Sequence, residues 1–140
     1  HGHLLELNDG EEFLRAIDDE DKESVVVVFI SDQSVKACEL MFKYLRVIAA
    51  DHPYVKFCRI LASAAGLSRH FKLSGVPALI VYKGGELLTS FVRITDALGE
   101  DFYASDVEGY LIEHGVLTDK SLVPSIIKGP AVAPNDSDSD

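Results

Sequence analysis

Two cysteines, Cys38 and Cys58, are the residues of this sequence best suited to covalent chemistry. They lie far apart in the chain and form neither a Cys-x-x-Cys pair nor a spacing typical of zinc ligands. Two interpretations are open: the cysteines form a disulfide with each other, or both are reduced and buried as small apolar side chains. We expect the second, which fits a cytosolic protein, because disulfides are rare in that compartment.

Other catalytic groups show no recognisable arrangement. The five histidines have no metal-ligand spacing apart from the terminal pair, His1 and His3. No serine stands in a nucleophile motif, and the Gly84-Gly85 pair is too short for a phosphate-binding loop. We therefore predict no catalytic residue, no metal site and no cofactor.

The composition fits one globular domain. With 140 residues and 47% hydrophobic content, the chain can bury a single core, and no apolar run approaches the roughly 20 residues that span a membrane. We expect a folded domain at residues 1–118 and a tail at residues 119–140 that is acidic and disordered from about residue 129. The start lacks a Met and a signal peptide, so we expect a domain excised from a longer protein.

Charge is unevenly distributed along the chain. The net charge is -10, yet residues 33–94 hold nine Lys and Arg against three Asp and Glu. This basic segment either is screened by the acidic ends in the folded domain or forms one face that attracts an acidic partner. The side chains of such a face would be Lys36, Lys43, Arg46, Arg69, Lys72 and Lys83. Nucleic acid is not expected as a partner of so acidic a chain.

The hydrophobic pattern predicts alternating strands and helices. Residues 25–30, Val-Val-Val-Val-Phe-Ile, form a continuous apolar run that needs cover on both faces, as a central strand does. Asp9 is expected to cap the first helix, which ends near Asp18, and Ser105 with Glu108 to open the last helix, which closes at Gly115. The expected order is βαβαβαββα, with further strands at residues 3–7, 54–61, 78–82 and 86–92 and further helices at residues 35–50 and 62–71.

A hairpin near the end of this series carries a first resemblance. Residues 78–82 form an apolar strand, Gly84-Gly85 supplies a two-residue turn, and residues 86–92 return as a second strand. Pro77 precedes the first strand, where we expect a cis bond. The pattern resembles the second half of a thioredoxin fold, which implies a central mixed sheet with helices on both faces and no long apolar edge exposed, hence a monomer.

Thioredoxin chemistry needs two thiols at the start of the second helix. Aligned from Phe29, the corresponding positions are Ser34 and Ala37, and neither is a thiol. Cys38 lies one residue beyond the motif and on the apolar side of its helix. A lone buried thiol does not resolve a mixed disulfide, so we expect a redox-inactive domain in which Pro77 is structural. An alternative keeps Cys38 as a reactive thiol that works with an external thiol.

Four segments carry a closer resemblance. They are Asp-Gly-Glu-Glu-Phe-Leu at residues 9–14, Tyr-Val-Lys-Phe-Cys-Arg-Ile at residues 54–60, Pro-Ala-Leu-Ile-Val-Tyr-Lys-Gly-Gly-Glu-Leu at residues 77–87 and Asp-Phe-Tyr-Ala-Ser-Asp-Val-Glu at residues 101–108. They resemble the thioredoxin-like domain of the phosducin and phosducin-like proteins, over about residues 3–118. Residues 95–104 lengthen the loop before the last helix, as in this family, and the run at residues 92–102 looks closer to phosducin-like protein.

The resemblance implies a cytoplasmic binding domain rather than an enzyme. Its partners would be the G-protein βγ dimer and the cytosolic chaperonin, with a co-chaperone role in βγ assembly; a co-chaperone for other clients, such as tubulin or actin, is an alternative. The family's N-terminal helical region is missing from this chain, which implies weaker βγ binding. The hairpin tip matches a family loop expected near the partner, and the polar face of the second helix is the other candidate contact: Lys83, Gly84, Gly85 and Glu86, and Lys36, Lys43 and Arg46. The serines and acids of the tail would solubilise the chain or accept phosphate.

Overall fold

A computed structural model describes residues 2–119. Five strands form one mixed sheet in the order β1-β3-β2-β4-β5. β1 and β2 run parallel to β3, β4 runs antiparallel to β2, and β5 runs antiparallel to β4. The strand bounds are β1 (Leu4–Leu7), β2 (Val25–Ser31), β3 (Lys56–Leu61), β4 (Ala78–Lys83) and β5 (Glu86–Phe91).

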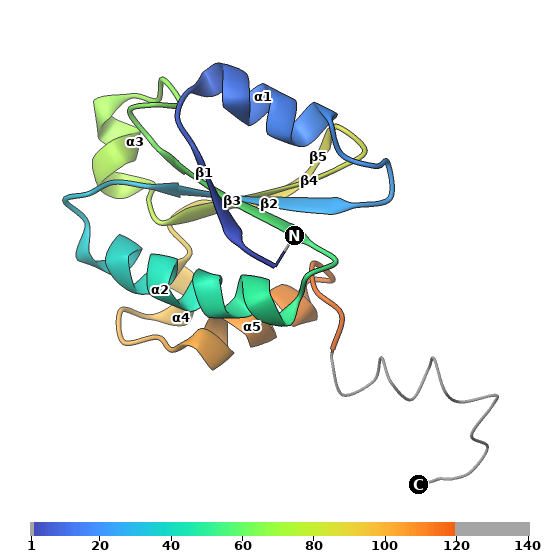
Figure 1. Cartoon of the computed structure of the whole chain (residues 1–140). Coiled ribbons are helices and arrows are strands. Elements are labelled where there is room, and N and C mark those ends of the chain that lie inside the picture. Colours follow the sequence, from blue (N-terminus) through green and yellow to red (C-terminus); the bar gives the residue numbers. More distant parts are fainter. Residues whose placement is uncertain (1, 120–140) are drawn as a thin grey trace, which may run out of the picture.

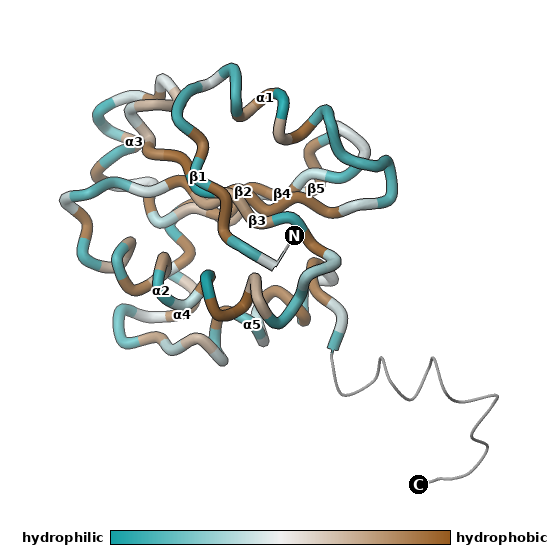
Figure 2. The backbone as a smooth tube through the Cα atoms, in the orientation of Figure 1, coloured by the Kyte–Doolittle hydropathy of each residue, from teal (hydrophilic) through white to brown (hydrophobic). Residues whose placement is uncertain are grey.

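Helices cover both faces of the sheet. α1 (Gly10–Asp18) and α3 (Arg69–Ser74) lie on one face, and α2 (Lys36–Asp51), α4 (Thr95–Leu98) and α5 (Ala104–Glu113) lie on the other (Figure 1). The central strand β2 is buried between the two layers, and its residues from Val26 to Phe29 are at most 1% exposed. Figure 2 shows the hydrophobic residues concentrated along the strands. The predicted double cover of this strand is confirmed.

Several local features of the structure agree with the predictions from the sequence. The Asp9 carboxylate accepts the Glu12 N–H at 2.9 Å and so caps α1, which ends at Asp18. Gly84 and Gly85 form the hairpin turn with φ of 62° and 80°, values that favour glycine. The Val76–Pro77 bond is cis, as expected.

The third helix is displaced from its predicted position. Residues 62–71 were expected to be helical, but residues 62–66 form turns and α3 begins only at Arg69. Gly66 has a φ of 77°, which is outside the right-handed helical region. Ser68 then caps α3 by accepting the Phe71 N–H at 3.2 Å. The prediction was wrong because it read the apolar spacing across this break.

The start of the last helix also differs. The predicted cap at Ser105 is wrong, since α5 begins at Ala104 and the Asp106 carboxylate accepts the Tyr103 N–H at 2.8 Å. The segment before it, expected as a loop, contains the short helix α4. β3 begins at Lys56, two residues later than predicted, because residues 53–55 form a turn and bend. The predicted tail lies outside the described residues apart from Asp119.

One sheet edge is more apolar than expected. Leu87 and Leu88 on the edge strand β5 are 59% and 57% exposed. An uncovered apolar edge is a surface on which another chain can pair. The two leucines point to opposite faces of the strand and do not form a long apolar edge, so the monomer stays a prediction.

Candidate functional site

The positions of the two thioredoxin thiols lie around the start of α2. Ser34 precedes the helix, and both its N–H, at 3.0 Å, and its hydroxyl donate to the Asp32 carboxylate. The hydrogen bonds from the Ser34 side chain and backbone lower the pKa of Asp32 below its usual value. Ile30 at the end of β2 pairs with Ala78, which places the following residues near Pro77. The structure thus brings Ser34 and the buried Ala37, the predicted counterparts of the two thiols, to the start of α2.

Both cysteines are free and buried, which confirms the expectation of reduced thiols. Cys38 is 4% exposed in the inner side of α2, and Cys58 is fully buried in β3. Burial raises the pKa of each thiol from 9.0 to about 11. Because the thiolate is the nucleophile, neither side chain is suited to thiol exchange, and the alternative of a reactive Cys38 loses its support.

We expect both thiols to resist modification in the native protein. A thiol-specific reagent near neutral pH should label neither Cys38 nor Cys58, because each is protonated and shielded from solvent. The same reagent should label both after denaturation in urea. Mass spectrometry of the two samples measures the difference, and rapid native labelling at Cys38 alone would revive the redox alternative.

The hairpin tip lies beside an acidic loop. Residues 83–86 are exposed, as a partner contact requires, but Lys83 Nζ lies 3.8 Å from the Glu23 carboxylate. The turn also approaches the backbone of the α1–β2 loop, where a Cβ added at Gly84 would come within 3.2 Å of the Lys22 carbonyl oxygen. The loop carries Asp19, Glu20, Asp21 and Glu23, and Asp18 ends the helix before it. The charge of Lys83 is therefore offset locally.

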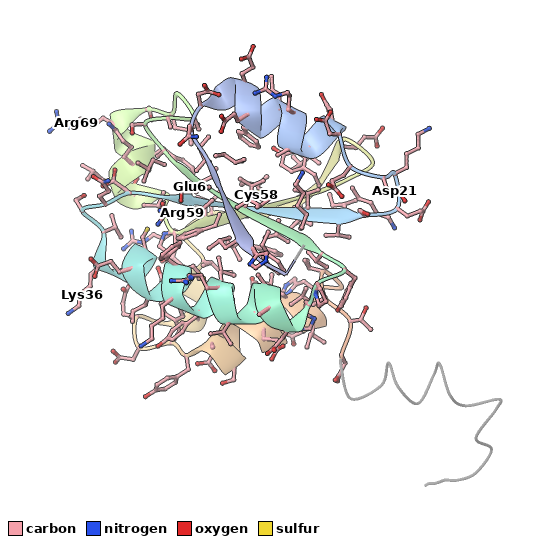
Figure 3. The ribbon with its side chains drawn as sticks, viewed as in Figure 1. Glu6, Asp21, Lys36, Cys58, Arg59 and Arg69 are labelled. Atoms are coloured by element: carbon pink, nitrogen blue, oxygen red, sulfur yellow. The ribbon has the colours of Figure 1, made fainter. Side chains whose placement is uncertain are left out.

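The polar face of α2 begins with Lys36 at the other end of the molecule. Lys36, Lys43 and Arg46 are all exposed on this face. Lys83 pairs with Val25 at the start of β2, whereas Lys36 follows the end of the same strand. A strand of this length spans about 20 Å, so Lys36 is well separated from Lys83. Lys43 and Arg46 lie beside the start of β1, at the opposite edge of the sheet from the β4–β5 hairpin. Lys83 therefore does not share the end of the molecule at which Figure 3 shows Lys36 and Arg69, opposite Asp21, and the alternative of a single face that includes all six basic side chains stays a prediction.

Sequence reasoning missed a polar cluster beside α2. The Arg59 guanidinium lies 4.0 Å from the centroid of the Phe42 ring and forms two contacts with Glu6, at 2.9 and 2.7 Å. Arg46 lies 5.7 Å from the same ring. The opposite charges of Glu6 and Arg59 would have been a usable signal for this cluster only once the β1–β3 pairing was known.

Sequence reasoning also missed a buried histidine that connects three parts of the fold. His52, after the end of α2, is fully buried. Its Nδ1 lies 2.8 Å from the Tyr54 hydroxyl, and its Nε2 contacts the Glu108 carboxylate of α5. The Tyr54 hydroxyl accepts the Thr118 N–H at 3.0 Å. No local pattern indicated this network, because its members are far apart in the sequence.

A family model described as Phosducin matches residues 1–139. The chain belongs to the phosducin family. It is 42% identical to bovine phosducin over 122 residues, which cover 87% of this chain and 50% of that protein. It is 44% identical to phosducin-like protein of Rattus norvegicus over 120 residues, which cover 86% of this chain and 40% of that protein. The chain thus spans half or less of these phosducin-family relatives, and the nearly equal identities leave its closer kinship to phosducin-like protein a prediction.

Solved thioredoxins share the fold of this phosducin-family chain. A thioredoxin of Nicotiana alata matches with a TM-score of 0.61 at 13% identity, covering 80% of this chain and 92% of that one. A thioredoxin of Fasciola hepatica matches with a TM-score of 0.59 at 13% identity, covering 81% of this chain and 96% of that one. The predicted thioredoxin-like fold is confirmed. Over residues 2–119, no helix is long and apolar enough to cross a membrane.

Proposed function

We propose that this chain is a non-catalytic, cytoplasmic binding domain that contacts the G-protein βγ dimer and acts with the cytosolic chaperonin in βγ assembly. The observation that carries the proposal is the match to the phosducin family on a thioredoxin-like fold whose thiol positions hold Ser34 and Ala37. A thioredoxin fold without exchangeable thiols retains surfaces for binding but not the groups for disulfide chemistry. We expect the domain to act as a monomer.

The α2 face is the better supported of the two candidate contacts. No ion pair among residues 2–119 engages Lys36, Lys43 or Arg46. Their charges are therefore available to carboxylates of a partner. Lys83 at the hairpin tip is near Glu23, so an acidic partner would also meet the acidic loop beside it.

A titration of the isotope-labelled chain with purified G-protein βγ tests the proposal. We expect NMR signals of residues 36–46 to change most, and the double variant Lys43→Glu/Arg46→Glu to weaken binding by about tenfold or more, since each reversal replaces attraction by repulsion. Lys22→Glu is the matched control, because Lys22 is also exposed but lies in the acidic loop. Absence of any change at high βγ concentration would refute βγ binding by this domain.

Changes confined to residues 83–86 would have a different meaning. They would keep the proposed partner but move the contact to the hairpin tip. In that case Lys83→Glu should weaken binding, and the α2 double variant should bind as the unaltered chain does.

A further inference from the structure

A groove of about 760 Å³ lies between the start of β1 and the outer side of α2. The chain entering β1 forms one wall and the helix forms the other. Figure 3 shows this side of the molecule and labels Glu6 and Arg59, whose ion pair lies beside Phe42 of α2. The groove is lined by Gly2, His3 and Leu4 on one side and by Phe42, Lys43, Arg46, Val47, Ala50 and Asp51 on the other.

The groove has a wall that is held in place before any partner binds. Glu6 holds the Arg59 guanidinium through two contacts, and that guanidinium lies against the Phe42 ring. Phe42 is half-buried, so part of its ring remains open to the groove. A wall whose side chains are already ordered loses little conformational entropy on binding.

β1 offers a free strand edge next to the groove. It is an edge strand that pairs only with β3 within the described part of the chain. Leu4 lines the groove, and the neighbouring Leu5 is 43% exposed. An extended segment can add to such an edge through main-chain hydrogen bonds, while its alternate side chains enter the adjoining groove.

The side chains of the groove define the chemistry of that segment. Lys43 and Arg46 have no ion-pair partner among residues 2–119 and project beside the exposed Val47, which is 54% accessible. They are cations on a chain of net charge -10, so they distinguish this groove from the rest of a mostly acidic molecule. The groove therefore combines attraction for carboxylates with apolar contact at Phe42 and Val47.

We propose that this groove binds an extended, acidic segment of a protein partner, which adds as a strand along β1. Its carboxylates contact Lys43 and Arg46, and an apolar side chain between them packs on Phe42 and Val47. The identity of the partner rests on the proposed function, since the segment would belong to βγ or to the chaperonin complex. The proposal that the groove binds such a segment depends only on the contacts described above.

A synthetic peptide of the pattern Glu-Ser-Leu-Ser-Glu-Ser, blocked at both ends, tests the groove without the partner, because its two acids and its leucine lie on the same face of an extended strand. Titrated into the labelled full chain, it should shift the amide signals of β1 and of residues 42–51. The double variant Lys43→Glu/Arg46→Glu should lower the affinity for the peptide by about tenfold, and Val47→Ala should lower it by about threefold. Lys22→Glu should leave binding unchanged, and a peptide with Lys in place of each acid should not bind.

The controls separate binding from folding. Lys43, Arg46 and Val47 are exposed, so each variant should unfold at the same urea concentration as the unaltered chain within error. Peptide shifts that are spread over the whole surface, or that survive the double variant, would overturn the proposal. So would movement of the signals of residues 129–140 in the free Arg46→Glu chain, because the occupant would then be the chain's own acidic segment.

Two experimental outcomes distinguish an error in the proposed groove from an error in the proposed function. Absence of peptide binding at β1 and α2 while βγ still binds the chain would overturn the groove and leave βγ binding standing. Peptide binding at β1 and α2 without any βγ binding would support the groove and remove βγ as its partner.

Discussion

His52→Ala is expected to lower the free energy of unfolding by about 3 kcal/mol. The imidazole is fully buried, and both of its nitrogens have polar partners, Tyr54 and Glu108. Alanine leaves a cavity and removes the hydrogen-bonding partner of both groups. Since His52 links the end of α2 to α5, we expect the two helices to lose their fixed relation. Urea denaturation followed by circular dichroism measures the loss.

Tyr54→Phe is the matched control for this network. It removes only the hydroxyl that joins His52 to the Thr118 backbone, so the expected loss is about 1 kcal/mol. The NMR signals near Thr118 should move in both variants. Equal stability of the His52→Ala chain and the unaltered chain would show that the network contributes nothing to the fold.

Stability should fall in mild alkali because of the two thiols. Burial raises the pKa of Cys38 and Cys58 from 9.0 to about 11 in the folded state. Above pH 9.0 the unfolded chain therefore loses these protons before the folded chain does, so stability decreases as the pH rises. The stability that the buried, protonated thiols contribute is fully present below pH 9.0 and is lost by about pH 11. This loss of stability amounts to about 2 to 3 kcal/mol per thiol.

The double variant Cys38→Ala/Cys58→Ala isolates this effect. It should be less stable near neutral pH, because two core side chains are shortened, yet its stability should fall less steeply between pH 9.0 and about 11. Tyr82, whose pKa burial also raises, remains in both chains and contributes equally to their slopes. Parallel losses of stability in urea titrations across this range would contradict the thiol explanation.

The fold could be predicted where local chemistry decides the structure. The β-branched run of β2 demanded cover on both faces, Asp9 offered a cap, and Gly84-Gly85 supplied the turn of a hairpin. The boundaries failed where a backbone conformation overrides side-chain spacing. At Gly66 the positive φ interrupts an apolar pattern that otherwise fits a helix.

The candidate site was harder to predict because it depends on which elements meet in space. Lys36 and Lys83 both belong to the basic segment, yet the antiparallel direction of β4 carries Lys83 back to the start of β2 and away from Lys36. The environment of Phe42 depends on Arg59 from β3 and Glu6 from β1, which the helical pattern of α2 does not contain. The residue types therefore indicated the candidate contact residues, and the direction of the strands decided which of these residues lie together in space.

Lys36 and Arg69 lie at the opposite end of the molecule from Asp21 of the acidic loop (Figure 3), so these charges contribute an electric dipole along the strands. In the field of an acidic partner, this contribution favours encounters in which Lys36 and Arg69 face the partner. This orientation speeds the encounter of the two proteins, but it does not strengthen the complex once it has formed. Added salt should therefore slow association much more than it speeds dissociation, because screening weakens the long-range torque while the short contacts remain.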